Sequence, residues 1–383
     1  MMEVVFWASA AMLFYSFVGY ALVLLAVSRL KPAAAPGAPW SPKTVSFIIA
    51  AHNEAQVIED KLRNTLALAS GGAEVEVILI SDGSTDATAE IARSVGDPRV
   101  LVLTPGRVGK AAALGLGLER SAGEIVVFSD ANAMLAEGSV AAMLRHFADP
   151  SIGGVCGRIV ARRGDGGEGG LGFAEGLFWR YDQMLKRAES RLGGTVSAQG
   201  SVYAMRRDLA IAPEPGYADD FIISVNAVAR GKRLAFEPEA RADEIVAETA
   251  DTELRRRVRS AELSWRSLMH RAELMNPFEH GWYAWQLASH KLVRRLNPLF
   301  LIGLLVSNLF LIGDGGVYAL TCLAQIAFYG LAASALLRPE LRRFKPASVA
   351  SFFLMSHAAM AIGFLRYAAG RKSLLWTPSR ESA

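Results

Sequence analysis

The stretch Gly123-Glu-Ile-Val-Val-Phe-Ser-Asp-Ala-Asn132 decides how the rest of the chain is interpreted. Ile125 to Phe128 is a short run of β-branched and aromatic residues, which is typical of a strand buried on both faces of a sheet. Open α/β sheets bind ligands at the carboxyl ends of their strands, where Asp130 and Asn132 follow. In extended geometry these two side chains point the same way and offer oxygen ligands to a divalent cation. A polar turn after a strand is the alternative.

Two similar runs precede this stretch, at 45–51 and 75–80, and both also end in polar residues. Those residues are His52, Asn53 and Glu54 after the first run and Ser81-Asp-Gly-Ser-Thr-Asp86 after the second. A further strand is predicted at 100–103, and helices at 55–69, 87–95 and 110–120. This alternation predicts an α/β fold with a parallel, doubly wound sheet.

The composition predicts a water-soluble domain joined to membrane segments. Hydrophobic residues make up 52% of the 383 residues and the mean hydropathy is +0.25, yet 20% of the residues are charged. The two cysteines, Cys156 and Cys322, provide neither a disulfide framework nor zinc-ligand spacing. The net charge of +4 comes from clusters of basic residues. Those at 294–295 and 342–345 border apolar segments, so they indicate contact with anionic lipid rather than with nucleic acid.

Val4 to Val27 contains no charged residue and is long enough to cross the ~30 Å hydrocarbon core of a membrane. Arg29 and Lys31 follow it, which places that end in the cytoplasm. An uncleaved anchor is favoured over a signal peptide, because the run is long and no Lys or Arg precedes it. Three more apolar stretches lie at 299–312, 317–337 and 347–365.

The C-terminal tail constrains how many of these three stretches cross the membrane. If all three span, Arg371 and Lys372 fall outside, against the positive-inside tendency. One stretch is therefore expected to be re-entrant or interfacial, and the short first one is the prime candidate. A preceding segment with Trp282, Tyr283 and Trp285 is expected to lie at the membrane interface.

The second half of the α/β region is less regular. A glycine-rich, mobile loop is predicted at 163–172, an amphipathic helix at 173–192, a strand at 202–205 and a basic helix at 252–271. Asp219 and Asp220 stand side by side before another helix.

Five short motifs occur in a fixed order along the chain. They are Ile49-Ala-Ala-His-Asn-Glu54, Ser81-Asp-Gly-Ser-Thr-Asp86, Gly109-Lys-Ala111, Asp130-Ala-Asn132 and Asp219-Asp220. With these motifs the chain resembles the membrane-bound family 2 glycosyltransferases, which are inverting enzymes with a Rossmann-like GT-A catalytic domain. The resemblance divides the chain into six parts. These are an anchor (1–30), a linker (31–43), the GT-A domain (44–271), an interfacial helix (272–297), transmembrane or re-entrant helices (298–369) and a tail (370–383).

The resemblance implies a set of donor-binding residues. They are Asn53, Glu54 and Asp82 around the uridine of a nucleotide sugar, Lys110 and Arg259 near the diphosphate, and Asp130 with Asn132 as ligands of Mg²⁺ or Mn²⁺. The last pair matches the family's DxD motif, in which the second position is usually Asp. A neutral amide oxygen is a weaker ligand than a carboxylate.

The resemblance also implies a catalytic base, Asp220, which takes the proton of the acceptor hydroxyl. Its neighbour Asp219 is expected to raise the pKa of Asp220 by like-charge repulsion. A helix N-cap is the alternative role for this pair. Gln199, Gly200 and Ser201 are assigned to the acceptor side.

One family motif, QxxRW, is altered. Its best match is Arg256-Arg-Val-Arg-Ser260, which keeps Arg259 but lacks the tryptophan that borders the acceptor sugar in processive synthases. We therefore expect transfer of a single sugar, although Trp265 lies nearby. The predicted reaction moves a sugar from a nucleotide-sugar donor, with a UDP-sugar as the first expectation, to a lipid-linked or glycan acceptor. It is expected to take place at the inner membrane, in envelope or exopolysaccharide biosynthesis. The alternatives are a processive exopolysaccharide synthase and a non-catalytic scaffold that binds nucleotide sugars.

Overall fold

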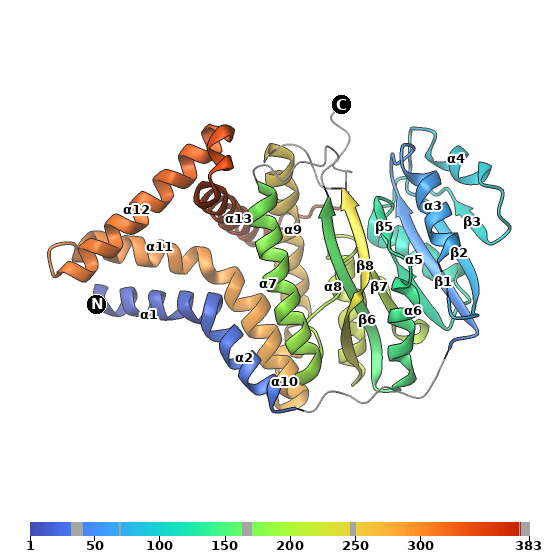
Figure 1. Ribbon diagram of the computed structural model, residues 1–383, viewed down its shortest axis with the longest axis horizontal. Coiled ribbons are helices and arrows are strands. Elements are labelled where there is room, and N and C mark those ends of the chain that lie inside the picture. The colour runs from blue at the N-terminus through green and yellow to red at the C-terminus, as the bar shows by residue number, and fades with distance from the viewer. Residues whose placement is uncertain (32–40, 69, 163–170, 246–249, 375, 377–383) are drawn as a thin grey trace.

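A mixed eight-stranded sheet forms one end of the molecule and a group of long helices forms the other (Figure 1). This computed structural model describes residues 1–31, 41–68, 70–162, 171–245, 250–374 and 376. Most of the predicted linker (32–40), most of the predicted glycine-rich loop (163–170) and the end of the tail (377–383) lie outside the described residues.

The sheet has the strand order β3-β2-β1-β4-β7-β6-β8-β5. The strands are β1 (Thr44–Ala51), β2 (Glu74–Ser81), β3 (Val100–Leu103), β4 (Ile125–Phe128), β5 (Ala133–Leu135), β6 (Ile152–Arg162), β7 (Tyr203–Arg206) and β8 (Arg233–Ile245). The first four strands are parallel, as predicted. The prediction of a parallel sheet is wrong beyond β4, because β7 runs antiparallel to it, with Phe128 opposite Tyr203 and Ile125 opposite Arg206. The chain enters β7 beside the end of β4, so β7 can only run back along that strand.

The predicted helices of the α/β region are present. They are α3 (Ile58–Ala67), α4 (Thr88–Ser94), α5 (Lys110–Arg120), α7 (Leu171–Leu192), α8 (Asp219–Ala229) and α9 (Ala250–His270), and a short α6 (Ser139–Leu144) is added. Helix α5 lies very close to the sheet at Gly117. A Cβ atom there would come within 2.7 Å of Ile48 and 2.8 Å of Ile80, so only glycine fits.

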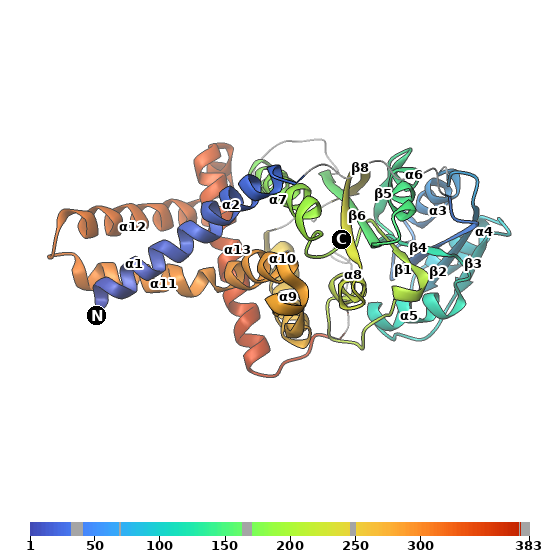
Figure 2. The ribbon, with the colours of Figure 1, turned by 90° about the horizontal axis from the view of Figure 1, so that it is seen from below.

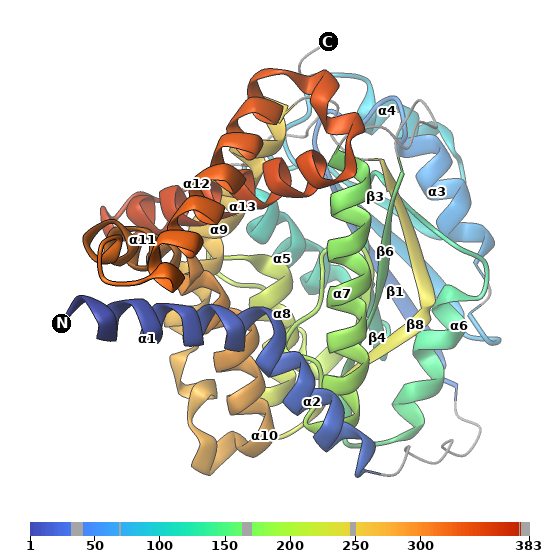
Figure 3. The ribbon, with the colours of Figure 1, turned by 60° about the vertical axis from the view of Figure 1, so that its left-hand side comes forward.

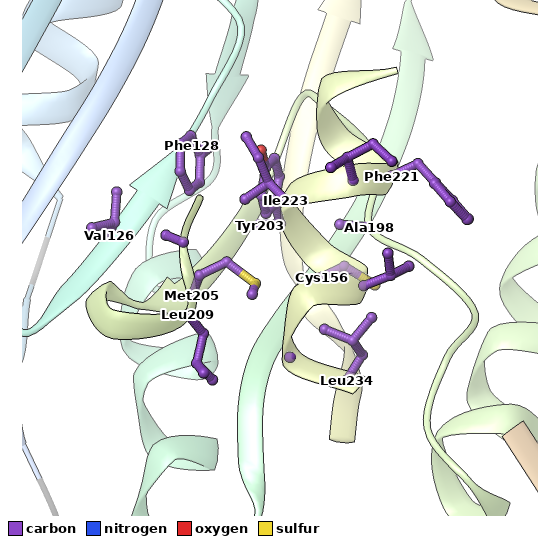
Figure 4. Close-up of a cluster of buried hydrophobic side chains, with 14 of the residues drawn as sticks. Val126, Phe128, Cys156, Ala198, Tyr203, Met205, Leu209, Phe221, Ile223 and Leu234 are labelled. Carbon is purple, nitrogen blue, oxygen red and sulfur yellow. The ribbon is translucent and has the colours of Figure 1, made fainter. Parts of the chain in front are cut away.

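Buried side chains fill the layers on the two faces of the sheet. Figure 4 shows one of these clusters, in which residues of β4 and β7 meet Phe221 and Ile223 of α8. The rings of Phe128 and Tyr203 stack with their centroids 4.6 Å apart. This packing fixes the first turn of α8 near the end of β4, and therefore brings Asp219 and Asp220 toward Asp130.

Four helical stretches are long and apolar enough to cross a membrane, by length and composition. They are Met2–Arg29 (α1, Met2–Phe14, and α2, Tyr20–Arg29, joined by a π-helical turn), Pro277–Leu311 (α10, Pro277–Leu287, and α11, Arg294–Leu311), α12 (Gly316–Leu337) and α13 (Lys345–Ala368). The prediction that the first C-terminal apolar stretch is short is therefore wrong for the helix that carries it, because this stretch continues α10 in a helix of 35 residues.

The helices α1, α11 and α12 project together away from the sheet, whereas α13 crosses them and packs against α9 and α7 (Figure 2). Tyr283 corrects one expectation about the interfacial segment. Its side chain is 2% exposed and its hydroxyl donates to the carbonyl of Val196, so it belongs to the core of the α/β domain.

Candidate active site

The polar ends of β1, β2 and β4 meet at one edge of the sheet, as the sequence predicts. Asn53, which follows β1, adopts a left-handed backbone conformation with φ of 53°. Its side-chain carbonyl accepts a hydrogen bond from the Thr85 amide at 2.8 Å, and the Glu54 amide donates to the Thr88 hydroxyl at 2.8 Å. Asn53 and Glu54 thus join the ends of β1 and β2 into one structure.

Asp82, which follows β2, is fully buried and surrounded by donors. Its carboxylate accepts hydrogen bonds from the amides of Val108 (2.7 Å) and Gly109 (3.1 Å) and from the guanidinium of Arg107 (2.8 Å). Asp82 therefore holds the loop that leads into α5. Gly83 makes the close approach possible, because its φ is +60° and a Cβ atom there would lie 2.9 Å from the backbone of Arg107.

The C-terminal tail reaches the same carboxylate. The indole nitrogen of Trp376 donates to Oδ2 of Asp82 at 3.2 Å, and Arg107 donates to the carbonyl oxygen of Trp376. The ring also lies edge-on to His52. No local pattern in the sequence predicts this contact, because it joins residues 294 positions apart.

Lys110 links the end of β4 to the first turn of α8. Its ammonium lies 2.7 Å from Oδ1 of Asp130 and 3.5 Å from Oδ2 of Asp219. Burial lowers the pKa of Lys110, but the two carboxylates outweigh burial and raise it above its ordinary value. Burial likewise raises the pKa of Asp130, and here the charge of Lys110 outweighs it, so that the pKa is lowered. Both groups therefore carry their charges at neutral pH.

Asp219 and Asp220 occupy the first turn of α8, after the N-cap residue Ala218. Neither aspartate is therefore the N-cap residue that the alternative interpretation required. Burial, followed by the charge of Asp219, raises the pKa of Asp220 to about 6. A carboxylate with that pKa is ionised at neutral pH and still basic enough to accept a proton, as a general base requires.

The segment 199–201 lies directly against this centre. A Cβ atom on Gly200 would be 3.3 Å from Oδ2 of Asp130 and 3.5 Å from the Lys110 ammonium. The hydroxyl of Ser201 lies 3.3 Å from Oδ2 of Asp130 and 2.7 Å from Glu244. Gln199 points differently, and its amide nitrogen donates to Asp182 on α7 at 3.4 Å.

Asp130 and Asn132 lie in a turn, which corrects the expectation of extended geometry. The amide of Ala133 donates to the carbonyl of Asp130 at 3.2 Å, which closes the turn. Glu244 of β8 brings a second carboxylate to Asp130, with Ser201 between them, and the sequence offered no signal for it. Burial, followed by the charge of Asp130, raises the pKa of Glu244. Two neighbouring carboxylates joined through the Ser201 hydroxyl offer oxygen ligands of the kind that a hard divalent cation prefers.

Arg259 on α9 is turned toward this centre. Burial lowers its pKa, and the charge of Asp219 acts in the opposite direction. Trp265 does not take the place of the missing family tryptophan at the acceptor. Its ring is buried against α13, with centroids 5.1 Å from Phe364 and 6.4 Å from Tyr367.

Lys61 is a site residue that the sequence analysis missed. It is fully buried, and its ammonium donates to the hydroxyl of Ser129 at 2.7 Å and to the carbonyl of Ala133 at 2.5 Å. Burial lowers its pKa to about 7, against the charge of Asp130. A signal was available, because Lys61 shares the buried face of α3 with Ile58 and Leu62.

Comparisons with known proteins agree with this geometry. Residues 46–211 match the family model described as glycosyl transferase family 2. The chain is 30% identical over 227 residues to a poly-beta-1,6-N-acetyl-D-glucosamine synthase of Staphylococcus aureus, covering 57% of this chain and 54% of that protein. A synthase of the same name from Staphylococcus epidermidis is 28% identical. This chain thus spans about half the length of these curated relatives.

Among solved structures, the mannosyltransferase PcManGT of Pyrobaculum calidifontis, in complex with GDP-Man and Mn²⁺, has the same fold. The TM-score is 0.71 at 23% identity, and the match covers 97% of this chain and 100% of that one. The match therefore includes the helices outside the sheet as well as the sheet domain. The motifs, the sheet topology and the family match together show that residues 46–211 form a domain of glycosyl transferase family 2 and that the chain has a GT-A fold.

Proposed function

We propose that the protein transfers a sugar, with inversion at the anomeric carbon, from a nucleotide-diphosphate sugar to a membrane-associated acceptor. The observation that carries this proposal is the arrangement of Lys110, which joins the Asp130 carboxylate to the Asp219–Asp220 pair. On one side of the Lys110 ammonium lies Asp130, which is suited to a metal-bound diphosphate. On the other side lies the aspartate pair, which is suited to the acceptor hydroxyl.

In this proposal Asp220 takes the proton of the acceptor hydroxyl. The hydroxyl oxygen forms a bond to the anomeric carbon while the bond from that carbon to the diphosphate breaks on the opposite face. Asp219 raises the basicity of Asp220 through its charge. Gly200 leaves room beside Asp130 and Lys110, and Ser201 borders the space assigned to the acceptor, whereas the Gln199 side chain is turned toward Asp182.

The departing diphosphate gains negative charge, and two cations of the chain face the place proposed for it. Lys110 stands at the N-terminus of α5, where the helix dipole also favours an anion. Arg259 faces it from α9 and can pair with phosphate oxygens. Asn53, Glu54 and Asp82 form the part of the site proposed for the nucleoside.

A divalent cation fits this site. Asp130 and Asn132 would hold it, and the carboxylate of Glu244 lies close enough to Asp130 to contribute. When bound, Mg²⁺ or Mn²⁺ would neutralise charge on the diphosphate. The described residues contain no group of three or more Asp, Glu, His or Cys side chains that could bind a metal alone, so the remaining ligands would come from the donor. The structural neighbour contains Mn²⁺ with GDP-Man, which supports this part of the proposal.

We further propose that α1, α11 and α12 cross the cytoplasmic membrane and that α13 lies along its inner surface. The apolar stretch of α13 is 44% buried within the protein, against 17% for that of α12. The contact of Trp376 with Asp82 requires the tail and the site to lie on the same side, and one entering and one returning helix after the GT-A domain satisfy this. In this arrangement the helices lie in the inner membrane and the site faces the cytoplasm. The GT-A domain then extends from about residue 44 to about residue 271.

Single transfer to a lipid-linked acceptor remains the proposed outcome, in envelope or exopolysaccharide biosynthesis. Processive synthesis is the second candidate, because the curated relatives carry the name of a polymer synthase. Against it, Trp265 packs on α13 instead of bordering the acceptor.

The test is a donor screen with the full-length protein in membranes, using UDP- and GDP-linked sugars with Mn²⁺, Mg²⁺ or chelator. The mass of the lipid fraction after reaction identifies the product. A single added sugar is the expected result, and a ladder of products would support the processive alternative. Full turnover in excess chelator would remove the metal from the proposal, and no turnover with any nucleotide sugar would overturn the proposal itself.

A further inference from the structure

A cavity with four arginines lies between the end of the N-terminal helix and α7. Its volume is about 430 Å³ and it is lined by Arg29 of α2, by Arg180, Arg187 and Arg191 of α7, and by apolar side chains that include Leu25 and Met184. The two helices lie side by side, as Figure 3 shows. Leu24 and Leu185 are buried between them, and Lys31 donates to the carbonyl of Leu192. The walls of the cavity are therefore held by the fold.

All four arginines are exposed to solvent around this cavity. Within the part of the chain that the structure describes, none of the four forms a hydrogen bond or ion pair. Arg187 and Arg191 are four positions apart on one helix, a spacing at which like charges repel. Arg29 and Arg191 lie in the last turns of their helices, where the helix dipole favours a cation. That explanation does not extend to Arg180 and Arg187, which lie earlier in α7.

The position of the cavity indicates where its ligand comes from. Arg29 ends the apolar helix Met2–Arg29, whose mean hydropathy is 2.2. About two and a half turns before it, Tyr20 contacts Trp285 with ring centroids 5.1 Å apart, and about four turns before it, Tyr15 accepts a hydrogen bond of 3.0 Å from the Trp285 indole. Tyrosine and tryptophan gather at the level of lipid headgroups. The arginines therefore lie at the end of the apolar helix, on the catalytic-domain side of this aromatic cluster.

We propose that this cavity binds the phosphate headgroup of an anionic membrane phospholipid. Guanidinium groups form paired hydrogen bonds with phosphate oxygens, and four of them supply both the donors and the positive charge that a phosphate headgroup requires. Leu25 and Met184 provide an apolar wall for the glycerol and the upper acyl chains. The site is separate from Asp130 and Asp220, and its occupancy does not depend on the proposed transfer reaction.

The test uses the full-length protein in neutral detergent and native mass spectrometry to count bound lipids. Phosphatidylglycerol and phosphatidylcholine with identical acyl chains are titrated separately. We expect phosphatidylglycerol to bind more tightly, and the double variant R180Q/R187Q to weaken its binding about 10- to 30-fold, since each basic residue near a lipid surface contributes severalfold. The matched control is R120Q/R230Q, which removes two exposed arginines elsewhere on the catalytic domain and should bind lipid as the wild type does.

Equal binding of the two lipids, or unchanged binding by R180Q/R187Q, would overturn the proposal. Inorganic phosphate is added as a competitor to separate the two sources of a phosphate group. Displacement of the lipid by phosphate at the same concentration would show that the ligand is a free anion and would also overturn it. The inactive variant D220N should retain lipid binding, which keeps this result distinct from the fate of the proposed reaction.

Discussion

The proposed donor half and the proposed acceptor half of the site both contain aspartates, but the surroundings of these aspartates differ. Asp82 accepts hydrogen bonds from two backbone amides and Arg107, and Asp130 contacts the Lys110 ammonium. Asp220 instead lies half-buried beside another carboxylate, and its pKa is raised to about 6. Well-partnered carboxylates hold a fixed charge and position other groups. A poorly partnered carboxylate retains affinity for a proton, which is the property that a general base needs.

The largest expected effect comes from removing that base. Asp220→Asn keeps the shape of the side chain but cannot accept a proton at neutral pH, so kcat should fall about 10²- to 10⁴-fold. Donor Kd, measured by calorimetry, should stay within about twofold, because this interaction is made in the transition state. Asp219→Asn is the control and should lose less activity. A nearly normal kcat for Asp220→Asn would end the assignment.

The raised pKa also predicts a pH dependence. The basic form of Asp220 is lost below pH 6, so kcat should fall about tenfold between pH 7.5 and pH 5. Stability should change in the opposite direction. Since the folded pKa lies above the unfolded value, ionisation of Asp220 lowers the free energy of unfolding as pH rises through about 6. Thermal unfolding should therefore show Asp220→Asn gaining more over the wild type at pH 7.5 than at pH 5. An equal difference at both pH values would show that Asp220 has an ordinary pKa.

Lys61 tests whether the donor half depends on its buried cation. Lys61→Met removes the bonds to Ser129 and Ala133, which flank the turn of Asp130 and Asn132. We expect the metal concentration for half-maximal activity to rise about tenfold, as for other groups that support metal ligands. Asn64→Ala is the matched control, because Asn64 joins the same helix to Leu135 but does not touch the turn. An equal rise in the control would show that Lys61 acts only through stability.

The parts of the site that could be predicted are those set by short-range patterns. Asp82, Asp130 and the parallel strands before them follow from buried runs that end in polar residues. The acceptor role of the segment 199–201 stays a prediction, and its contact with Asp130 depends on β7 running antiparallel to β4, which no local pattern indicates. Glu244 arrives from the far strand β8 for the same reason.

The membrane half could be predicted only in part. Apolar length identified the helices, because the thickness of a bilayer sets a minimum length. The orientation of α13 depends on its packing against α9 and α7, which hydropathy does not encode. The sequence pattern also predicted two separate segments where the structure has one helical stretch, Pro277–Leu311. The reason is that its first part carries the core residue Tyr283 and only its last part carries the apolar run.

The smallest expected effect concerns Trp376, which occupies the edge of Asp82 that a nucleoside would need. Its indole N–H donates to Oδ2 of Asp82, while its ring lies near Arg107 and His52. If the donor forms a hydrogen bond to the same oxygen, it must displace this N–H. Trp376→Phe keeps an aromatic ring and removes the competing donor, so donor Kd should decrease about threefold, within the range of one net hydrogen bond. Trp376→Ala removes the ring as well and separates the two contributions. Weaker donor binding by Trp376→Phe would show that the indole N–H stabilises the bound donor. Trp376 would then be part of the donor site instead of a group that the donor must displace.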